Sequence, residues 1–182
     1  EVDTILCPIG GGGIIAGVAV AAKALNPNVK VIGVQTSNIP SMQESVKNGE
    51  VTTAFKAATI ADGIAVKTPG DATFEIIKEL VDEVITVTEE EIAQGMLFLL
   101  EHQKIVSEGA GAVSTAALLS KKYQPTEGEK VVCIVSGGNV DVNTLYRVIG
   151  VGLAKEGRRY SFSTTMTDKP GGFLELISII SK

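Results

Sequence analysis

Four consecutive glycines, Gly10–Gly13, separate an apolar run from a helix-like run in the stretch CPIGGGGIIAGVAVAAKAL. Glycine loses more conformational freedom on folding than other residues, so a run of glycines marks backbone that needs a positive φ or a close approach to another group. The residues before the run predict a buried strand, and those after it predict a helix whose first charge is Lys23. A strand, a glycine loop and a helix N-terminus point several unpaired N–H groups at one spot, which favours a phosphate site. A tight turn packed under a neighbouring strand is the alternative.

Strand-like and helix-like patterns alternate along most of the remaining chain. Strands are predicted over 29–36, 83–88 and 129–136, and helices over 71–81, 90–103, 107–123 and 141–157. Thr88 followed by Glu91 has the spacing of a capping box. This alternation predicts an α/β fold, with an open, mostly parallel sheet and helices on both faces. Ligands of such folds collect at the carboxyl ends of the strands.

Charge and cysteine usage exclude several classes of partner. The formal net charge of −5 and the absence of a Lys/Arg cluster argue against nucleic acid. No apolar run is long enough to cross a membrane. Cys7 and Cys133 lie in apolar strand-like runs, which predicts buried thiols rather than a disulfide or a metal pair. We therefore expect a cytoplasmic protein.

A nicotinamide or flavin site is one candidate for the glycine loop. Gly11, Gly13 and Ala16 fit the loose pattern G-x-G-x-x-G/A. Such a site also needs an acidic residue after the second strand to bind the ribose, and this strand ends GVQTSN without Asp or Glu. A cofactor with a phosphate and no ribose fits better. A second glycine turn, SGGN at 136–139, closes another strand and is suited to meet the ring of such a cofactor.

Four ordered motifs carry a resemblance to a known family. They are GGGGIIAG, TIADGIAV, SEGAGA and SGGNVD, in that order along residues 1–156. Together they resemble the second half of the catalytic domain of fold-type II pyridoxal-phosphate enzymes, and within that group threonine dehydratase, also called threonine ammonia-lyase. The resemblance implies pyridoxal 5′-phosphate (PLP) as cofactor. It implies β-elimination of L-threonine to 2-oxobutanoate and ammonia, or of L-serine to pyruvate.

The same resemblance implies a role for individual residues. The backbone amides of Gly10, Gly11, Gly12 and Gly13 bind the cofactor phosphate, and the hydroxyl of Ser136 hydrogen-bonds the pyridine nitrogen. A neutral hydroxyl there makes the ring a weaker electron sink than a carboxylate partner does. Glu108 lies beside cofactor and substrate as a catalytic residue, or is a helix N-terminal carboxylate, or both. Gly63 is a ring-side backbone contact or a turn glycine.

The lysine that forms the Schiff base is missing from this sequence. In the family it lies in an S/T-x-K-x-R-G-A type motif ahead of the glycine loop, and no such motif occurs here. The lysines with the wrong sequence context are Lys23, Lys56, Lys67 and Lys104. We therefore predict that the chain alone binds PLP weakly, if at all, and is inactive.

Three further residues are predicted to have no catalytic or metal role. The serine racemase branch has a Glu and an Asp for a divalent cation, and Gln35 and Ser41 stand at the aligned positions here. Neutral oxygens bind hard cations weakly, so we expect no Mg²⁺ or Ca²⁺ site. His102, the single histidine, ends a helix pattern and is predicted to face solvent.

The character of the sequence changes near Arg158. Residues 1–157 are expected to be the C-terminal part of the catalytic domain, and 158–182 the beginning of a second domain with a strand, a turn and a helix. The tail TTMTDKPGGFLELISIIS resembles the start of an ACT domain, which implies an amino-acid effector, allosteric control as in isoleucine biosynthesis, and a homo-oligomer. The chain opens inside a strand pattern and closes inside a helix pattern, as expected of a piece of something longer.

Two other classes of function stay open at this point. One is a different fold-type II activity, such as serine dehydratase or racemase, which an upstream substrate loop decides. The other is a catalytically silent amino-acid sensor that uses the ACT-like segment. A lysine motif upstream of Glu1 discriminates the enzyme from the sensor.

Overall fold

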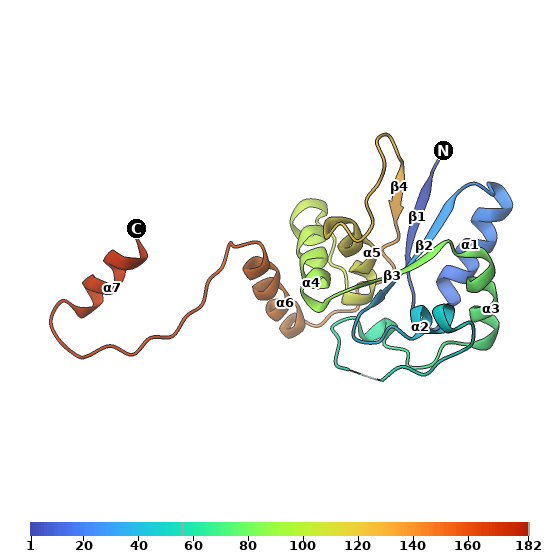
Figure 1. The fold of residues 1–182 in the computed structure, drawn as a ribbon. Coiled ribbons are helices and arrows are strands. Elements are labelled where there is room, and N and C mark those ends of the chain that lie inside the picture. The colour runs from blue at the N-terminus through green and yellow to red at the C-terminus, as the bar shows by residue number, and fades with distance from the viewer. Residues whose placement is uncertain (56, 182) are drawn as a thin grey trace.

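A computed structural model describes residues 1–55 and 57–181 as a parallel sheet flanked by helices (Figure 1). The four strands lie in the order β3-β2-β1-β4, and every neighbouring pair is parallel. Their bounds are β1 (Thr4–Pro8), β2 (Lys30–Thr36), β3 (Glu83–Val87) and β4 (Val131–Cys133). The predicted α/β fold is confirmed. Parallel pairing also places the residues that follow each strand at one edge of the sheet.

Helices cover both faces of this sheet (Figure 1). Those on one face pack on the buried side chains of β1 and β2, and are α1 (Gly13–Leu25), α2 (Ser41–Asn48) and α3 (Asp71–Leu80). Those on the other face are α4 (Glu89–Phe98), α5 (Gly109–Leu119) and α6 (Val142–Lys155). Two short turns of other helix types complete this body, a 3₁₀ turn η1 (Asp62–Ile64) and a π turn η2 (Leu99–Gln103).

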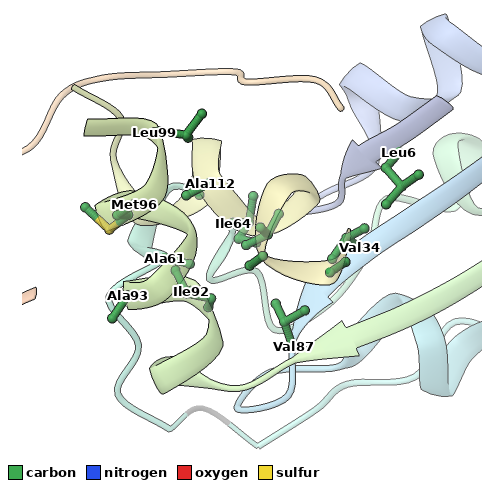
Figure 2. Packing of buried hydrophobic residues seen from close by; sticks show 14 of the residues in the cluster. Leu6, Val34, Ala61, Ile64, Val87, Ile92, Ala93, Met96, Leu99 and Ala112 are labelled. Carbon is green, nitrogen blue, oxygen red and sulfur yellow. The ribbon is translucent and has the colours of Figure 1, made fainter. Parts of the chain in front are cut away.

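Aliphatic side chains and close backbone contacts build the larger core, between the sheet and α4 and α5 (Figure 2). Leu6 and Val34 from the strands lie on one side of α5, and Ile92 and Met96 of α4 lie on its other side (Figure 2). All residues of α5 from Gly109 to Ala117 are buried and small. A Cβ added at Gly95 would lie 3.0 Å from the carbonyl oxygen of Ala112, so α4 approaches α5 nearly to backbone contact. Aromatic side chains are therefore not needed to fill this space.

Local predictions made from capping and exposure hold in the structure. Thr88 Oγ1 accepts a hydrogen bond from Glu91 N (3.3 Å), and the Glu91 carboxylate accepts one from Thr88 N (2.8 Å). This reciprocal pair is the predicted capping box at the start of α4. His102 is exposed, as predicted, and its ring packs on Phe98 at a centroid distance of 4.7 Å.

The C-terminal segment differs from the prediction. The sequence predicts a strand within 158–171, but these residues form none, and α7 (Gly172–Ile180) is the regular element that follows. In Figure 1 this segment runs away from the sheet and carries α7 apart from it. A strand needs a neighbouring strand for its backbone hydrogen bonds, and within the described residues the tail has no strand beside it. The predicted helix is present, because a helix satisfies its backbone internally.

Candidate cofactor site

Helix α3 packs against one side of the glycine loop between β1 and α1. Gly12 has φ 96°, and a Cβ there would lie 2.8 Å from Ile77 Cδ1 and 2.9 Å from Thr73. Thr73 Oγ1 also donates a hydrogen bond to the carbonyl oxygen of Gly11 (2.6 Å). A left-handed conformation and a crowded α-carbon both require glycine at position 12.

The opposite side of the same loop is open. A Cβ added at Gly11 or Gly13 would meet no atom within 4 Å. Ala16 N donates to Gly12 O (3.0 Å), so the amides of residues 13–15 precede the first intrahelical bond of α1. The first turn of α1 holds no acidic residue. Exposed amides, a positive helix end and free space above the α-carbons fit the phosphate of PLP.

The turn η1 packs between this loop and the N-terminus of α5 and contacts both. A Cβ at Gly10 would lie 3.1 Å from the Cα of Ile64. At Gly63, a Cβ would lie 3.1 Å from Ala110 Cβ and 3.6 Å from Glu108 Oε1. Gly10 and Gly63 therefore sit on adjoining backbone segments, although 53 positions separate them in the sequence. Only this tertiary arrangement brings Gly63 beside Glu108.

A carboxylate from α4 holds the segment that leads into η1. Glu89 Oε1 accepts hydrogen bonds from Thr59 Oγ1 (2.6 Å) and Thr36 Oγ1 (3.0 Å). Glu89 Oε2 accepts one from Ile60 N (2.7 Å). The end of β2, the start of α4 and residues 59–61 are thus tied at one point. Sequence reasoning places Glu89 in a helix start only, and no local signal marks its partners.

Glu108 lies at the N-terminus of α5, on the border of the site. It is the N-cap residue, and its side chain makes no capping hydrogen bond. Its half-buried carboxylate lies between Gly63 and Gly137, where a Cβ on Gly137 would collide with Oε1. Glycine at position 137 leaves room for this carboxylate.

Ser136 lies on the turn after β4, one residue before Gly137, and is exposed. The carbonyl oxygen of Gly137 accepts hydrogen bonds from Glu108 N (3.2 Å) and Ser107 Oγ (3.1 Å). The structure therefore brings the Ser136 turn and Glu108 together at the carboxyl ends of β1 and β4. Sequence reasoning missed Thr73 and Ser107, because both act on residues at least 30 positions away.

The positions aligned with a cation site are used for hydrogen bonds within the protein. Gln35 Oε1 accepts from Met42 N (3.0 Å) and Gln43 N (2.9 Å), which caps the start of α2. Ser41 Oγ donates to Val66 O (2.7 Å). The side chains of Gln35 and Ser41 are both fully buried. Within residues 1–55 and 57–181, no three His, Cys, Asp or Glu side chains gather as a metal site would need.

Two of the lysines named from the sequence, Lys23 and Lys104, are held by hydrogen bonds away from this arrangement. Lys23 Nζ contacts Asp82 Oδ2 (2.8 Å) and Val29 O (2.7 Å), at the opposite end of the sheet. Lys104 Nζ donates to Glu101 O (2.6 Å), and Lys67 is exposed. Lys56 falls outside the described residues.

Both thiols are free and behave as packing groups. Burial raises the pKa of Cys7 to about 12 and that of Cys133 to about 11. These raised pKa values favour the protonated thiol at neutral pH, and a protonated thiol is a weak nucleophile. This agrees with the prediction of buried thiols, with Cys7 fully buried and Cys133 half-buried.

The fold and this site define a class of protein. The parallel α/β sheet with helices on both faces is shared with solved fold-type II PLP enzymes. The model of the family "Pyridoxal-phosphate dependent enzyme" matches residues 1–137. The chain belongs to this family.

Relatives within the family carry more specific names. The L-threonine ammonia-lyase of Thermotoga maritima is 51% identical over 182 residues, which is 100% of this chain and 45% of that protein. The solved structure of maize serine racemase matches with a TM-score of 0.75 and 39% identity, over 81% of this chain and 47% of that one. A solved threonine deaminase from T.th. matches with a TM-score of 0.73 and 34% identity, over 78% and 50%. The chain thus spans about half the length of its curated relatives.

A membrane-spanning role finds no support in the helices. Among the residues that the structure describes, none of the helices combines the length and the apolar character needed to cross a bilayer.

Proposed function

We propose that this chain forms the phosphate-binding and ring-binding part of a PLP-dependent L-threonine ammonia-lyase. The full enzyme converts L-threonine to 2-oxobutanoate and ammonia, and L-serine to pyruvate. The observation that carries this proposal is the meeting of the Gly10–Gly13 cradle, Glu108 and the Ser136 turn at one edge of the sheet. The names of the T. maritima ammonia-lyase and the T.th. threonine deaminase support the choice of reaction.

The residues of the chain divide the binding of PLP between them. The amides of Gly10, Gly11, Gly12 and Gly13 hold the phosphate, where open space and the α1 dipole favour a dianion. Ser136 donates to or accepts from the pyridine nitrogen, and as a neutral group it does not keep that nitrogen charged. Gly63 leaves the ring face uncovered by a side chain. When bound, PLP withdraws electrons from the α-carbon of an amino-acid substrate.

Glu108 is proposed to hold and orient a proton beside the substrate. Its carboxylate faces the space between Gly63 and Gly137 and makes no capping hydrogen bond, so its oxygens are available to a ligand. A carboxylate there suits proton transfer to or from groups on the α- and β-carbons, with loss of the β-hydroxyl as water.

The Schiff-base lysine is proposed to lie in a part of the enzyme outside these 182 residues. Lys23 and Lys104, with hydrogen bonds elsewhere, are poor candidates. Residues 1–157 then form the C-terminal part of the catalytic domain. Residues 158–182 begin an ACT-like regulatory domain that takes an amino-acid effector, in a cytoplasmic homo-oligomer. The exposed apolar face of α7, with Phe173 and Ile177, supports packing against further chain.

Serine racemisation is the second candidate. Its support is the maize serine racemase structure, which is 39% identical to this chain. Racemisation returns the proton to the opposite face of the α-carbon and keeps the β-hydroxyl, whereas elimination releases it. Release of an oxo acid therefore separates the lyase from the racemase.

The test is a trapping experiment on the full-length gene product. The protein is loaded with PLP, reduced with borohydride and digested, and the modified peptide is mapped. We expect a phosphopyridoxyl lysine upstream of Glu1, followed by oxo-acid release from threonine and from serine. D-serine formation without oxo acid supports the racemase instead. The absence of any adduct overturns the enzyme proposal and leaves an amino-acid sensor.

A further inference from the structure

The carbonyl oxygen of Gly137 is held by two donors from one segment. Glu108 N donates at 3.2 Å and Ser107 Oγ at 3.1 Å. Ser107 Oγ also lies 3.0 Å from the carbonyl oxygen of Glu108. The hydroxyl has one proton to donate, so the carbonyl oxygens of Glu108 and Gly137 share it, and Ser107 lies within hydrogen-bond distance of both backbones.

The packing around this hydroxyl leaves little freedom. Ser107 is only 1% exposed. A Cβ at Gly111 would lie 2.6 Å from both Ser107 Oγ and the Gly137 oxygen, and a Cβ at Gly138 would lie 2.8 Å from Val106 O. The Ser136 turn therefore rests on the backbone of residues 106–111 without side chains between them. Displacement of the Gly137 carbonyl moves Ser136 relative to Glu108.

From this geometry we propose that Ser107 is a positioning residue that fixes the distance between the Ser136 hydroxyl and the Glu108 carboxylate. The proposal rests on the proposed function, since it concerns how two residues of that site are held. Ser107 touches neither cofactor nor substrate. Its loss leaves the hydrogen bond from Glu108 N in place, so the fold survives while the turn gains freedom.

The helix that follows Ser107, α5, supplies a matched control. Ser114 lies in α5, is fully buried, and its Oγ has no hydrogen-bond partner within the described part of the chain. Ser114→Ala removes a buried hydroxyl of the same size without touching the Ser136 turn. Ser107→Ala and Ser114→Ala therefore differ in the hydrogen bond to Gly137 and not in the kind of atom removed.

The test compares both variants of the full-length gene product in two measurements. In Ser107→Ala, we expect amide exchange of Glu108, whose N–H donates to Gly137 O, to be about tenfold faster without cofactor. In the same variant we expect kcat for threonine to fall about tenfold, KM to change less than about twofold and PLP absorption to shift. Ser114→Ala is expected to match the wild type in all of these.

The outcomes separate this inference from the proposed function. If Ser107→Ala keeps the amide exchange rate of Glu108 and the kcat of the wild type, the positioning role is overturned, even if the enzyme deaminates threonine. Equal effects in Ser114→Ala also overturn it, because any buried serine then matters alike. If the wild type releases no oxo acid, the proposed function fails, and faster exchange confined to Ser107→Ala still shows the link to the Ser136 turn.

Discussion

Gly12 and Gly13 are adjacent, but the lack of a side chain has a different cause at each. Gly12 combines φ 96° with crowding from Ile77 and Thr73. Gly13 has ordinary helical geometry at the start of α1 and open space around it. At Gly12 the fold demands glycine, whereas at Gly13 no contact within the described chain demands it.

This contrast predicts different effects of the same substitution. Gly12→Ala places a Cβ in a left-handed conformation and against Ile77, and should lower the free energy of unfolding by about 1–2 kcal/mol. Gly13→Ala should change stability by less than about 0.5 kcal/mol, since nothing meets its Cβ. Urea unfolding followed by circular dichroism measures both. An equal decrease in the free energy of unfolding for the two variants would contradict the assignment of a structural role to Gly12 alone.

The connection between α5 and β4 is held by a carboxylate. Glu129 accepts hydrogen bonds from Thr4 Oγ1 (2.6 Å), from the Tyr123 hydroxyl and from Thr126 N (2.8 Å). The bond from Thr4, followed by those from Tyr123 and Thr126, lowers the pKa of Glu129 to about 2. This cluster lies at the amino ends of the strands, so it joins elements without entering the candidate site.

The lowered pKa predicts an acid-dependent loss of stability. Because the carboxylate is favoured in the folded state, its contribution is complete above the ordinary glutamate pKa of about 4.3 and is lost as the pH falls through about 2. Glu129→Gln should be less stable at pH 6 and should lose less between pH 4 and pH 2. Urea midpoints across this range measure it, with Glu127→Gln, an exposed neighbour, as control. If the urea midpoint of Glu129→Gln falls between pH 4 and pH 2 as much as that of the wild type, the Glu129 carboxylate does not stabilise this connection.

At the scale of the whole molecule, the described chain presents one side of a site. The glycine cradle, Glu108 and Ser136 lie at one edge of the sheet, while Lys23 and Lys104 are engaged elsewhere. Relatives are about twice as long as this chain. Under the proposed function, a complete site includes residues outside these 182, the Schiff-base lysine above all.

The chain of 182 residues alone is therefore expected to be inactive. Purified with excess PLP and L-threonine, it should release no 2-oxobutanoate above a protein-free control, and borohydride should label no single lysine. The full-length gene product, assayed in parallel, should do both. Oxo-acid release by the chain alone would refute the assignment of the lysine to the missing part.

Local sequence patterns predicted much of this fold. The strand, glycine loop and helix at 4–25, the capping box at Thr88 and the parallel alternation of elements were all readable. Each depends on neighbours within a few positions or on side-chain periodicity, which the sequence displays directly. The strand expected after Arg158 failed because a strand depends on a partner that no local pattern supplies.

By itself, the sequence determined that a glycine-rich amide cradle follows a buried strand, and its motifs pointed to the PLP family. Tertiary structure alone decided that Gly63, Glu108 and Gly137 meet, that Thr73 pins Gly11, and that Ser107 holds the Ser136 turn. The physical reason is that these contacts join backbone segments 29 or more positions apart. The order of the parallel strands and the small residues of α5 bring these segments together. Neither feature produces a periodic pattern in the sequence around the contacting residues.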